Sequence, residues 1–186
     1  MTAPKLSVIV PAFNHEAYIV AALHSVLAQT LGDLELIVID DASRDGTWDA
    51  IQSIRDPRLR ALRHEHNQGA HATLNEGLGL ARGDYLAILN SDDAFHPERL
   101  ERMVSALGNT PHLAFSDVAF IDGDGQPAPD HERARDYAAA STLCAAQPPA
   151  SWLLTSNLAI TTSNFVFPRA LFERIGSFSD LRYTHD

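Results

Sequence analysis

Short apolar runs alternate with amphipathic stretches over the first two thirds of the chain. The apolar runs are rich in aliphatic residues and are bounded by turn-forming residues, which is typical of buried strands. They cover Lys5–Val10, Leu34–Asp40, Leu59–Leu62 and Tyr85–Leu89. We expect Pro11 to end the first strand, because proline has no amide N–H to donate within a sheet.

The stretches between these runs have the spacing of amphipathic helices. In the first, Ile19, Leu23 and Val26 fall on one helical face. Thr47 is a suitable N-cap for the second helix. The helices are expected over residues 15–30, 48–54, 69–81 and 96–107. Because each strand is a continuous apolar run and helices separate the strands, the pattern predicts a parallel α/β sheet.

The pattern changes after about residue 111. Residues 112–126 predict two short strands and a tight turn at "DGDG". Residues 127–150 are rich in proline and alanine and lack a clear period, so we expect a long loop or lid. A last short strand then leads into a helix, which Pro168 should open and Gly176 should end.

Composition limits the classes of partner. The chain has 186 residues, 45% of them apolar, and a net charge of −10, which argues against a non-specific nucleic-acid binder and against a basic membrane-surface patch. Its lone cysteine, Cys144, allows no intrachain disulfide. No apolar stretch reaches 18 residues, so we expect no transmembrane segment in this chain. The cytoplasm is the expected compartment.

Polar residues follow each expected strand. Asn14 follows the first, Asp40 and Asp41 the second, Asn67 the third, and Asn90–Asp93 the fourth. Turn formation or helix capping would explain each group alone. Open parallel sheets bind ligands beyond the carboxyl ends of their strands. Four polar strand ends at one edge therefore indicate a ligand site.

Two adjacent carboxylates at a strand end suggest a divalent cation. Mg²⁺ or Mn²⁺ is held by one or two carboxylates together with phosphate oxygens of the substrate. Such an ion would let an acidic protein bind a diphosphate and would stabilise it as a leaving group. Neither a Walker A pattern nor "GxGxxG" after the first strand is present, which disfavours P-loop NTPases and dinucleotide-dependent dehydrogenases.

Four segments together resemble the family 2 glycosyltransferases of GT-A fold. They are "LSVIVPAFNHEAYIVAALHSVLAQT", "LELIVIDDASRDGT", "NQGAHATLNEGLGLARGDYLAILNSDD" and "FERIGSFSD". The resemblance implies a Rossmann-like, mostly parallel central sheet flanked by helices, with a smaller mixed β region in the C-terminal half. It also implies inverting transfer of a sugar from a nucleoside-diphosphate donor, commonly UDP-linked, to a hydroxyl of a glycan or glycoconjugate, as in polysaccharide biosynthesis.

The resemblance also assigns roles to individual residues. Asp92 would bind the divalent metal, with Asp93 as a second ligand or beside it. Asp186 would be the catalytic base that deprotonates the acceptor hydroxyl, with His185 in place of the acid that usually precedes it. The nucleotide-binding residues would be Pro11, Phe13, Asn14, Asp40, Asp41, Asn67, Gly69, Asn75, Asn90 and Ser91.

Two positions depart from the family pattern. Asn90 stands where the "DxD" motif has its first aspartate, and since an amide is a poorer metal ligand than a carboxylate, we expect Asn90 to contact the ribose. Leu74 stands where many members carry arginine; His71 or Arg82 could substitute for it.

We expect one GT-A domain with two halves. Residues 1–110 would bind the nucleotide sugar, and residues 111–186 would form an acceptor-side half that is truncated at the expected base. Parts beyond this chain could place the enzyme at a membrane. Two other functions are open. A nucleotidyltransferase is disfavoured because "PAFNHEA" has neither glycine nor lysine to hold a triphosphate. A non-catalytic nucleotide-sugar-binding module also fits.

Overall fold

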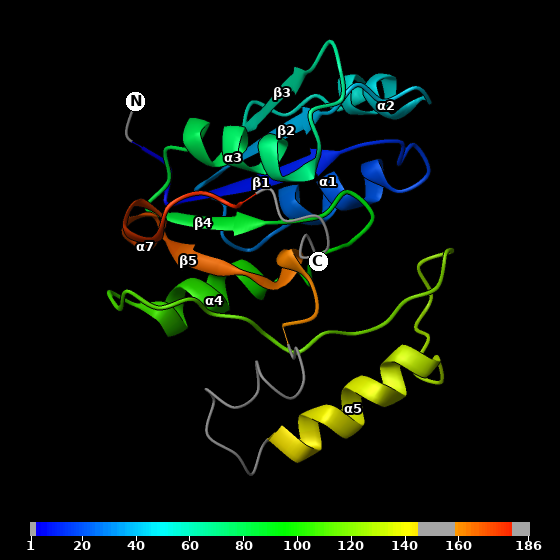
Figure 1. Ribbon diagram of the computed structural model, residues 1–186, viewed down its shortest axis with the longest axis vertical. Coiled ribbons are helices and arrows are strands. Elements are labelled where there is room, and N and C mark those ends of the chain that lie inside the picture. The colour runs from blue at the N-terminus through cyan, green and yellow to red at the C-terminus, as the bar shows by residue number, and fades with distance from the viewer. Residues whose placement is uncertain (1–2, 145–158, 180–186) are drawn as a thin grey trace. The chain divides into compact units, whose positions relative to one another are not determined.

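The computed structural model describes residues 3–144 and 159–179, and the strands in this part of the chain form one five-stranded sheet. The strand order is β3-β2-β1-β4-β5 (Figure 1). The strands are β1 (Leu6–Ala12), β2 (Leu34–Asp40), β3 (Leu59–Arg63), β4 (Tyr85–Ile88) and β5 (Val166–Pro168). Strands β1 to β4 are parallel, and β5 runs antiparallel to its neighbour β4. The expected mostly parallel α/β sheet is therefore confirmed.

The first four expected helices are present. The helices are α1 (Ile19–Leu27), α2 (Thr47–Ser53), α3 (Ala70–Leu80), α4 (Arg99–Leu107), α5 (Glu132–Cys144) and α7 (Arg169–Ile175), with a short 3₁₀ helix η1 (Thr162–Asn164). None of these is long and apolar enough to span a bilayer. Pro168 and Gly176 flank α7 as expected, and Gly176 has a positive φ of 88°.

Thr47 is not the N-cap of α2, so that prediction is wrong by one position. Gly46 takes the cap position, and Thr47 is the first helical residue. The carboxylate of Asp45 accepts hydrogen bonds from the backbone N–H and the hydroxyl of Thr47, at 3.0 and 2.6 Å. An acidic side chain just before the helix thus satisfies an amide that the helix itself leaves free.

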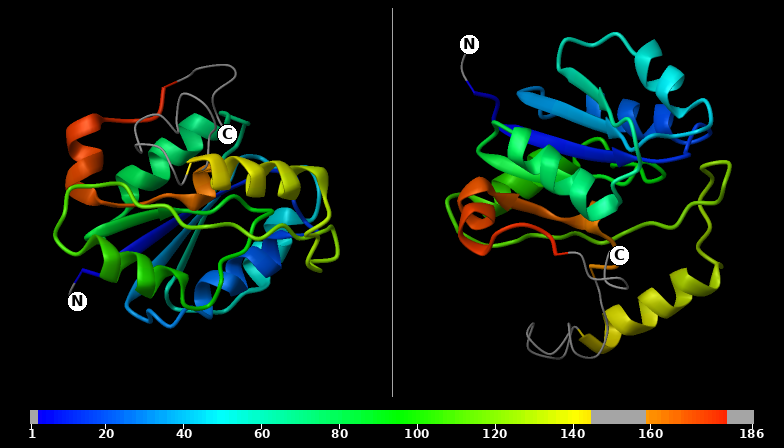
Figure 2. Two further views of the ribbon diagram at one scale, coloured as in Figure 1. Left: turned by 90° about the horizontal axis from the view of Figure 1, so that it is seen from below. Right: turned by 45° about the horizontal axis from the view of Figure 1, so that its top comes forward.

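Helices cover both faces of the sheet (Figure 2, left). One core lies between the sheet and helices α1, α2 and α4, and it contains Val8 and Val10 of β1. The other lies between the sheet and helices α3 and α7, and it contains Ile9 of β1. Successive residues of a strand point to opposite faces. Since both faces are covered, β1 and β2 can be apolar almost throughout.

Strand β1 continues through Pro11 to Ala12, so the expectation that Pro11 ends it is wrong. The pairing of β1 with β4 stops at Ile9, opposite Ile88. The N–H of Leu89 donates to the carbonyl of Ile9, so Ile9 and Pro11, two residues on, face the β4 side of β1. Strand β4 has ended there, and the missing N–H of Pro11 breaks no ladder hydrogen bond.

By backbone contacts the chain divides into two compact units, residues 1–115 with 161–186, and residues 116–160. In the second unit, hydrogen bonds close the expected turn between Asp122 and Gln126. Isolated bridges at Ala114 and Ile121 replace the two strands expected over residues 112–126.

Helix α5 corrects the expectation of an irregular loop over residues 127–150. It covers Glu132–Cys144, while residues 145–150 lie outside the described part of the chain. Its sequence, "ERARDYAAASTLC", is rich in alanine, which has the highest intrinsic helix propensity. A high intrinsic helix propensity can form a helix without an amphipathic period. The periodicity of apolar residues therefore did not predict α5.

Helix α3 passes very close to β1 at one of its two internal glycines, Gly77. A Cβ atom on Gly77 would lie 2.5 Å from Cγ2 of Ile9, which is fully buried. Gly79, two residues on, is exposed and has nothing within 4 Å of the corresponding position. Only the first of these two glycines is therefore required by packing.

We predict opposite effects of alanine at these two glycines. Gly77→Ala should lower the free energy of unfolding by about 1–3 kcal/mol through overpacking. Gly79→Ala should raise it by up to about 1 kcal/mol, since alanine is the better helix former. Chemical denaturation of both variants measures the difference. Equal effects at the two positions would contradict the close packing of α3 on β1.

Candidate functional site

The loops that follow the four parallel strands are joined to one another by hydrogen bonds. The N–H of Asn14, after β1, donates to Oγ of Ser43, after β2, at 2.9 Å. Nδ1 of His15, also after β1, lies 2.7 Å from Oγ of Ser91, after β4. Asp41 joins the loop after β2 to the loop after β3. The polar strand ends therefore form one continuous edge, as the sequence predicted.

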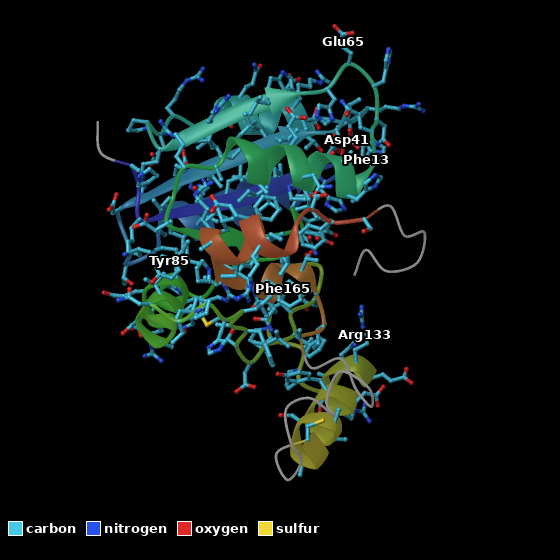
Figure 3. All side chains as sticks on the ribbon, turned by 60° about the vertical axis from the view of Figure 1, so that its left-hand side comes forward. Phe13, Asp41, Glu65, Tyr85, Arg133 and Phe165 are labelled. Atoms are coloured by element: carbon cyan, nitrogen blue, oxygen red, sulfur yellow. The ribbon has the colours of Figure 1, made fainter. Side chains whose placement is uncertain are left out.

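A pocket of about 760 Å³ opens at this edge. It is lined by Phe13, Ala42, Ser43, Arg44, Arg63, His64, Glu65, His66 and Asn67. Phe13 is 42% exposed, which leaves an aromatic side chain available to a ligand. Figure 3 shows Phe13 and Asp41 at one end of the sheet and Tyr85, the first residue of β4, at the opposite end.

The backbone beside the pocket is strained at two residues. Asn14 and Ala42 have positive φ angles of 54° and 61°. Asparagine tolerates this region better than most residues, whereas alanine does not favour it. Such conformations persist only where the surrounding structure holds them, and they concentrate at ligand sites.

Asp40 is fully buried beneath the pocket and forms an ion pair. Nε of Arg63 lies 2.9 Å from Oδ2 of Asp40, and the N–H of Ser43 donates to Oδ1 at 3.3 Å. Arg63 also donates to the carbonyl of Ser43 at 2.8 Å and lies over the ring of Trp48. The guanidinium thus neutralises Asp40 and holds the "DDAS" turn in place.

Asp41 organises the turn that carries Asn67 and Gly69. Its carboxylate accepts hydrogen bonds from the backbone N–H groups of Gln68 and Gly69, at 2.8 and 2.9 Å. The side-chain amide of Asn67 donates to the backbone carbonyl of Asp41 at 3.2 Å. Gly69 has a φ of 89°, which favours glycine there.

His64 completes this cluster by bridging two carboxylates. Its Nδ1 lies 2.6 Å from Oδ1 of Asp41, and its Nε2 lies 2.8 Å from Oε2 of Glu76 on α3. Burial by itself would raise the pKa of Asp41, but the hydrogen bonds from His64 and the turn N–H groups lower it overall. Burial would likewise lower the pKa of His64, but the two carboxylates raise it above its ordinary value.

The bridge should make stability depend on pH. A histidine whose pKa is raised by folding contributes stability that is full below its unfolded pKa of about 6.5 and is lost as the pH rises through the folded value. We therefore expect His64→Gln to lower the free energy of unfolding more at about pH 6 than at about pH 9. Denaturant titrations of both proteins at the two pH values measure this.

The exposed His112 provides the control, because no hydrogen bond or ion pair joins it to any other residue that the structure describes. His112→Gln should change stability little and equally at both pH values. A loss from His64→Gln that is constant with pH would show that the ring is held by packing rather than by its charge.

The expected metal residues lie at the end of β4. Asp92 is exposed, whereas the carboxylate of Asp93 accepts a hydrogen bond from Ser163 at 2.6 Å. No group of three or more histidine, cysteine or acidic side chains within residues 3–144 and 159–179 could hold a metal by itself. Carboxylate oxygens nevertheless suit Mg²⁺ or Mn²⁺, and the remaining coordination positions would be filled by phosphate oxygens and water.

Asn75 and Arg82 lie away from the pocket. The side-chain amide of Asn75 bonds to the backbone N–H and carbonyl of Phe178, both at 2.8 Å, and so ties α3 to the segment after α7. Arg82 pairs with Glu35, the second residue of β2, at the amino edge of the sheet. Of the two substitutes considered for the family arginine at Leu74, only His71, in the first turn of α3, remains.

The remaining expected residues are placed as follows. Pro11 lies in β1 itself, one residue before the strand ends. The expected base, Asp186, lies outside the described residues together with His185. Three residues that the sequence analysis did not single out, Arg63, His64 and Ser163, contact expected site residues. In the sequence, only their proximity to a motif or to the end of a strand points to these residues, and this is a weak signal.

Comparison with known proteins gives the family. The glycosyl transferase family 2 model matches residues 7–176. The succinoglycan biosynthesis protein ExoO of Rhizobium meliloti (strain 1021) is 38% identical over 123 residues, which cover 64% of this chain and 35% of that protein. The Escherichia coli UDP-Glc:alpha-D-GlcNAc-diphosphoundecaprenol beta-1,3-glucosyltransferase WfaP is 35% identical over 99 residues, 53% of this chain and 39% of that protein. The chain thus spans less than half the length of these relatives.

Two solved structures share the fold. One is S. aureus TarS 1-349 in complex with UDP, with a TM-score of 0.66 and 24% identity, covering 91% of this chain and 48% of that chain. The other is the mannosyltransferase PcManGT from Pyrobaculum calidifontis in complex with GDP-Man and Mn2+, with a TM-score of 0.66 and 22% identity, covering 96% and 48%. Because the family model spans nearly the whole sequence, this chain belongs to glycosyl transferase family 2.

Proposed function

We propose that the protein transfers a sugar from a nucleoside-diphosphate donor, UDP-linked, to a hydroxyl of a glycan or glycoconjugate, with inversion at the anomeric carbon. The observation that carries this proposal is the hydrogen-bonded union of four polar loops at the carboxyl edge of the sheet. That edge combines a pocket beside Phe13 with an exposed carboxylate, Asp92. Membership of the family and the UDP-Glc donor named for WfaP support the same activity.

In this proposal the pocket holds the nucleoside. Phe13 offers an aromatic surface to a planar base, and the amide of Asn67 offers hydrogen-bonding groups beside it. Asp41 shapes the pocket from behind by fixing the turn before α3. Asp40 is fully buried, so a direct bond between its carboxylate and the base would need neighbouring side chains to move.

The diphosphate would lie toward the end of β4. Asp92 would hold a divalent cation, with Asp93 beside it, and a bound cation would neutralise the charge that develops on the departing diphosphate. Asn14 and His15 are fixed next to this region by Ser43 and Ser91. The loop after β1 can thus orient the donor between the base pocket and the acidic residues.

The transfer itself is a single in-line displacement. The acceptor hydroxyl oxygen attacks the anomeric carbon, the bond from that carbon to the diphosphate oxygen breaks, and the electron pair leaves with the diphosphate. A carboxylate must take the hydroxyl proton during this step. We assign that role to Asp186, which follows the "GSFSD" segment in the sequence.

Nucleotide binding provides the first test. Calorimetry should show that UDP binds more tightly with Mn²⁺ than without it, and more tightly than GDP. Asp92→Asn should weaken UDP binding in Mn²⁺ at least about tenfold, because a charged metal ligand is lost, and should leave metal-free binding unchanged. Asp84→Asn makes the same change just before the first residue of β4 and should have no effect. Failure of both nucleotides to bind, with or without Mn²⁺, would refute the proposed function.

Catalysis provides the second test and separates an enzyme from a nucleotide-sugar-binding module. Release of UDP from a UDP-sugar, with water or an added glycan as acceptor, reports turnover. Asp186→Asn should lower the rate at least about 100-fold, since a general base is lost, while UDP affinity stays the same. Tight UDP-sugar binding without any turnover would favour the binding module.

A further inference from the structure

A buried polar segment from late in the chain lies against the residues that end β4. Thr161, Thr162 and Ser163 hydrogen-bond to Asn90 and Asp93, and each of these bonds joins residues that are 70 or more positions apart in the sequence. We call these three residues the hydroxyl cradle. Thr162 and Ser163 are only 7% and 6% exposed. Buried hydroxyls are costly unless they are paired, so the cradle and the β4 end satisfy each other.

Ser163 makes two of these contacts through one atom. Its Oγ accepts a hydrogen bond from the backbone N–H of Asn90 at 2.8 Å and donates one to Oδ2 of Asp93 at 2.6 Å. The N–H of Asp93 also donates to the carbonyl of Asn90 at 3.1 Å. These three bonds close a ring that fixes the backbone of the turn and the direction of the Asp93 carboxylate.

The cradle also explains the asparagine at position 90. The side-chain amide nitrogen of Asn90 donates to Oγ1 of Thr161 at 2.8 Å, and its amide oxygen accepts from Oγ1 of Thr162 at 3.2 Å. The Thr161 hydroxyl thus accepts a hydrogen bond from Asn90, and the Thr162 hydroxyl donates one to it. An amide supplies both a donor and an acceptor, whereas an ionised carboxylate supplies only acceptors.

Helix α4 contacts Asn164, the residue that follows the hydroxyl cradle. Nη2 of Arg99, the first residue of α4, donates to the backbone carbonyl of Asn164 at 2.9 Å and to its side-chain oxygen at 3.0 Å. Arg99 is 9% exposed, and its guanidinium lies 4.5 Å from the centre of the Phe95 ring. The packing around Arg99 therefore limits the movement of the neighbouring hydroxyls, even when the carboxylate of Asp93 is displaced.

From this geometry we propose that Ser163 is a positioning residue for cation binding. It holds Asp93 in the hydrogen-bonded ring, so that Asp93 supports the turn while the exposed Asp92 is the carboxylate that binds the divalent cation directly. Asn90 then supports the same turn and contacts neither the cation nor the nucleotide. This inference rests on the proposed function, because it concerns the cation that would accompany the nucleotide.

Calorimetry with Mn²⁺ and UDP tests the role of Ser163. Ser163→Ala should reduce the gain in UDP affinity on adding Mn²⁺ by about tenfold, because Asp93 loses the hydrogen bond from Ser163, while UDP affinity without metal stays unchanged. Ser163→Thr keeps the hydroxyl and should restore most of the gain. Ser53→Ala, which removes an exposed hydroxyl on α2, is the matched control and should behave as the unaltered protein.

Substitutions of the two acids separate their roles. Asp92→Asn should abolish the Mn²⁺-dependent gain, whereas Asp93→Asn should reduce it about tenfold, as Ser163→Ala does. The double change at Ser163 and Asp93 should be no worse than Asp93→Asn alone, since both changes affect the hydrogen bond between Ser163 and Asp93. Additive losses, or equal losses from the two acids, would overturn the proposal. The comparison of Asp92→Asn with Asp93→Asn decides the matter even where Ser163→Ala fails to fold.

The remaining outcomes are also decisive. A Ser163→Ala protein with an unchanged Mn²⁺ effect would overturn the inference and leave the proposed function standing. A protein in which metal-free and metal-dependent binding fall alike would show a general structural role and overturn it too. An unaltered protein that binds UDP without any Mn²⁺ effect would defeat the inference together with the metal-assisted part of the proposed function.

Discussion

The pairing of β1 between β2 and β4 is the constraint on which the rest of the molecule depends. Both neighbours run parallel to β1, so three strands end at the same edge, and β3 joins them through β2. Burial of β1 on both faces fixes its register, because a shift of one residue would exchange Ile9 with the valines that pack against the other helical layer. The polar loops can converge only because this pairing brings the strand ends together.

The converging loops bury two carboxylates, and neighbouring groups stabilise each of them. Asp40 and Asp41 are nearly inaccessible to water, and a buried carboxylate is unfavourable without partners. Arg63 neutralises Asp40, while His64 and two backbone N–H groups stabilise Asp41. The two carboxylates thereby fix the turns that carry pocket-lining residues, whereas Asp92 at the end of β4 is exposed.

The motifs at the ends of the strands divide into residues that face the pocket and residues that hold it. Phe13 and Asn67 line the cavity. Asn75 and Asn90 instead hydrogen-bond through their side-chain amides, Asn75 to the Phe178 backbone and Asn90 to the threonine hydroxyls. Both kinds of residue occur side by side in the same short motifs. Sequence position alone therefore does not separate a residue that contacts a ligand from one that fixes the loop around it.

The sequence by itself determined the parallel α/β sheet, the five strands that form it, the first four helices and the edge at which the polar residues gather. These follow from local patterns, since apolar period and turn residues act over a few positions. Helix α5 was not predicted, because a high alanine content can form a helix without such a period. The roles of Arg63, His64 and Ser163 were decided only by tertiary structure. Each acts on a partner at least 12 residues away, and hydrogen-bond partners at that separation are chosen by the packing of the whole sheet.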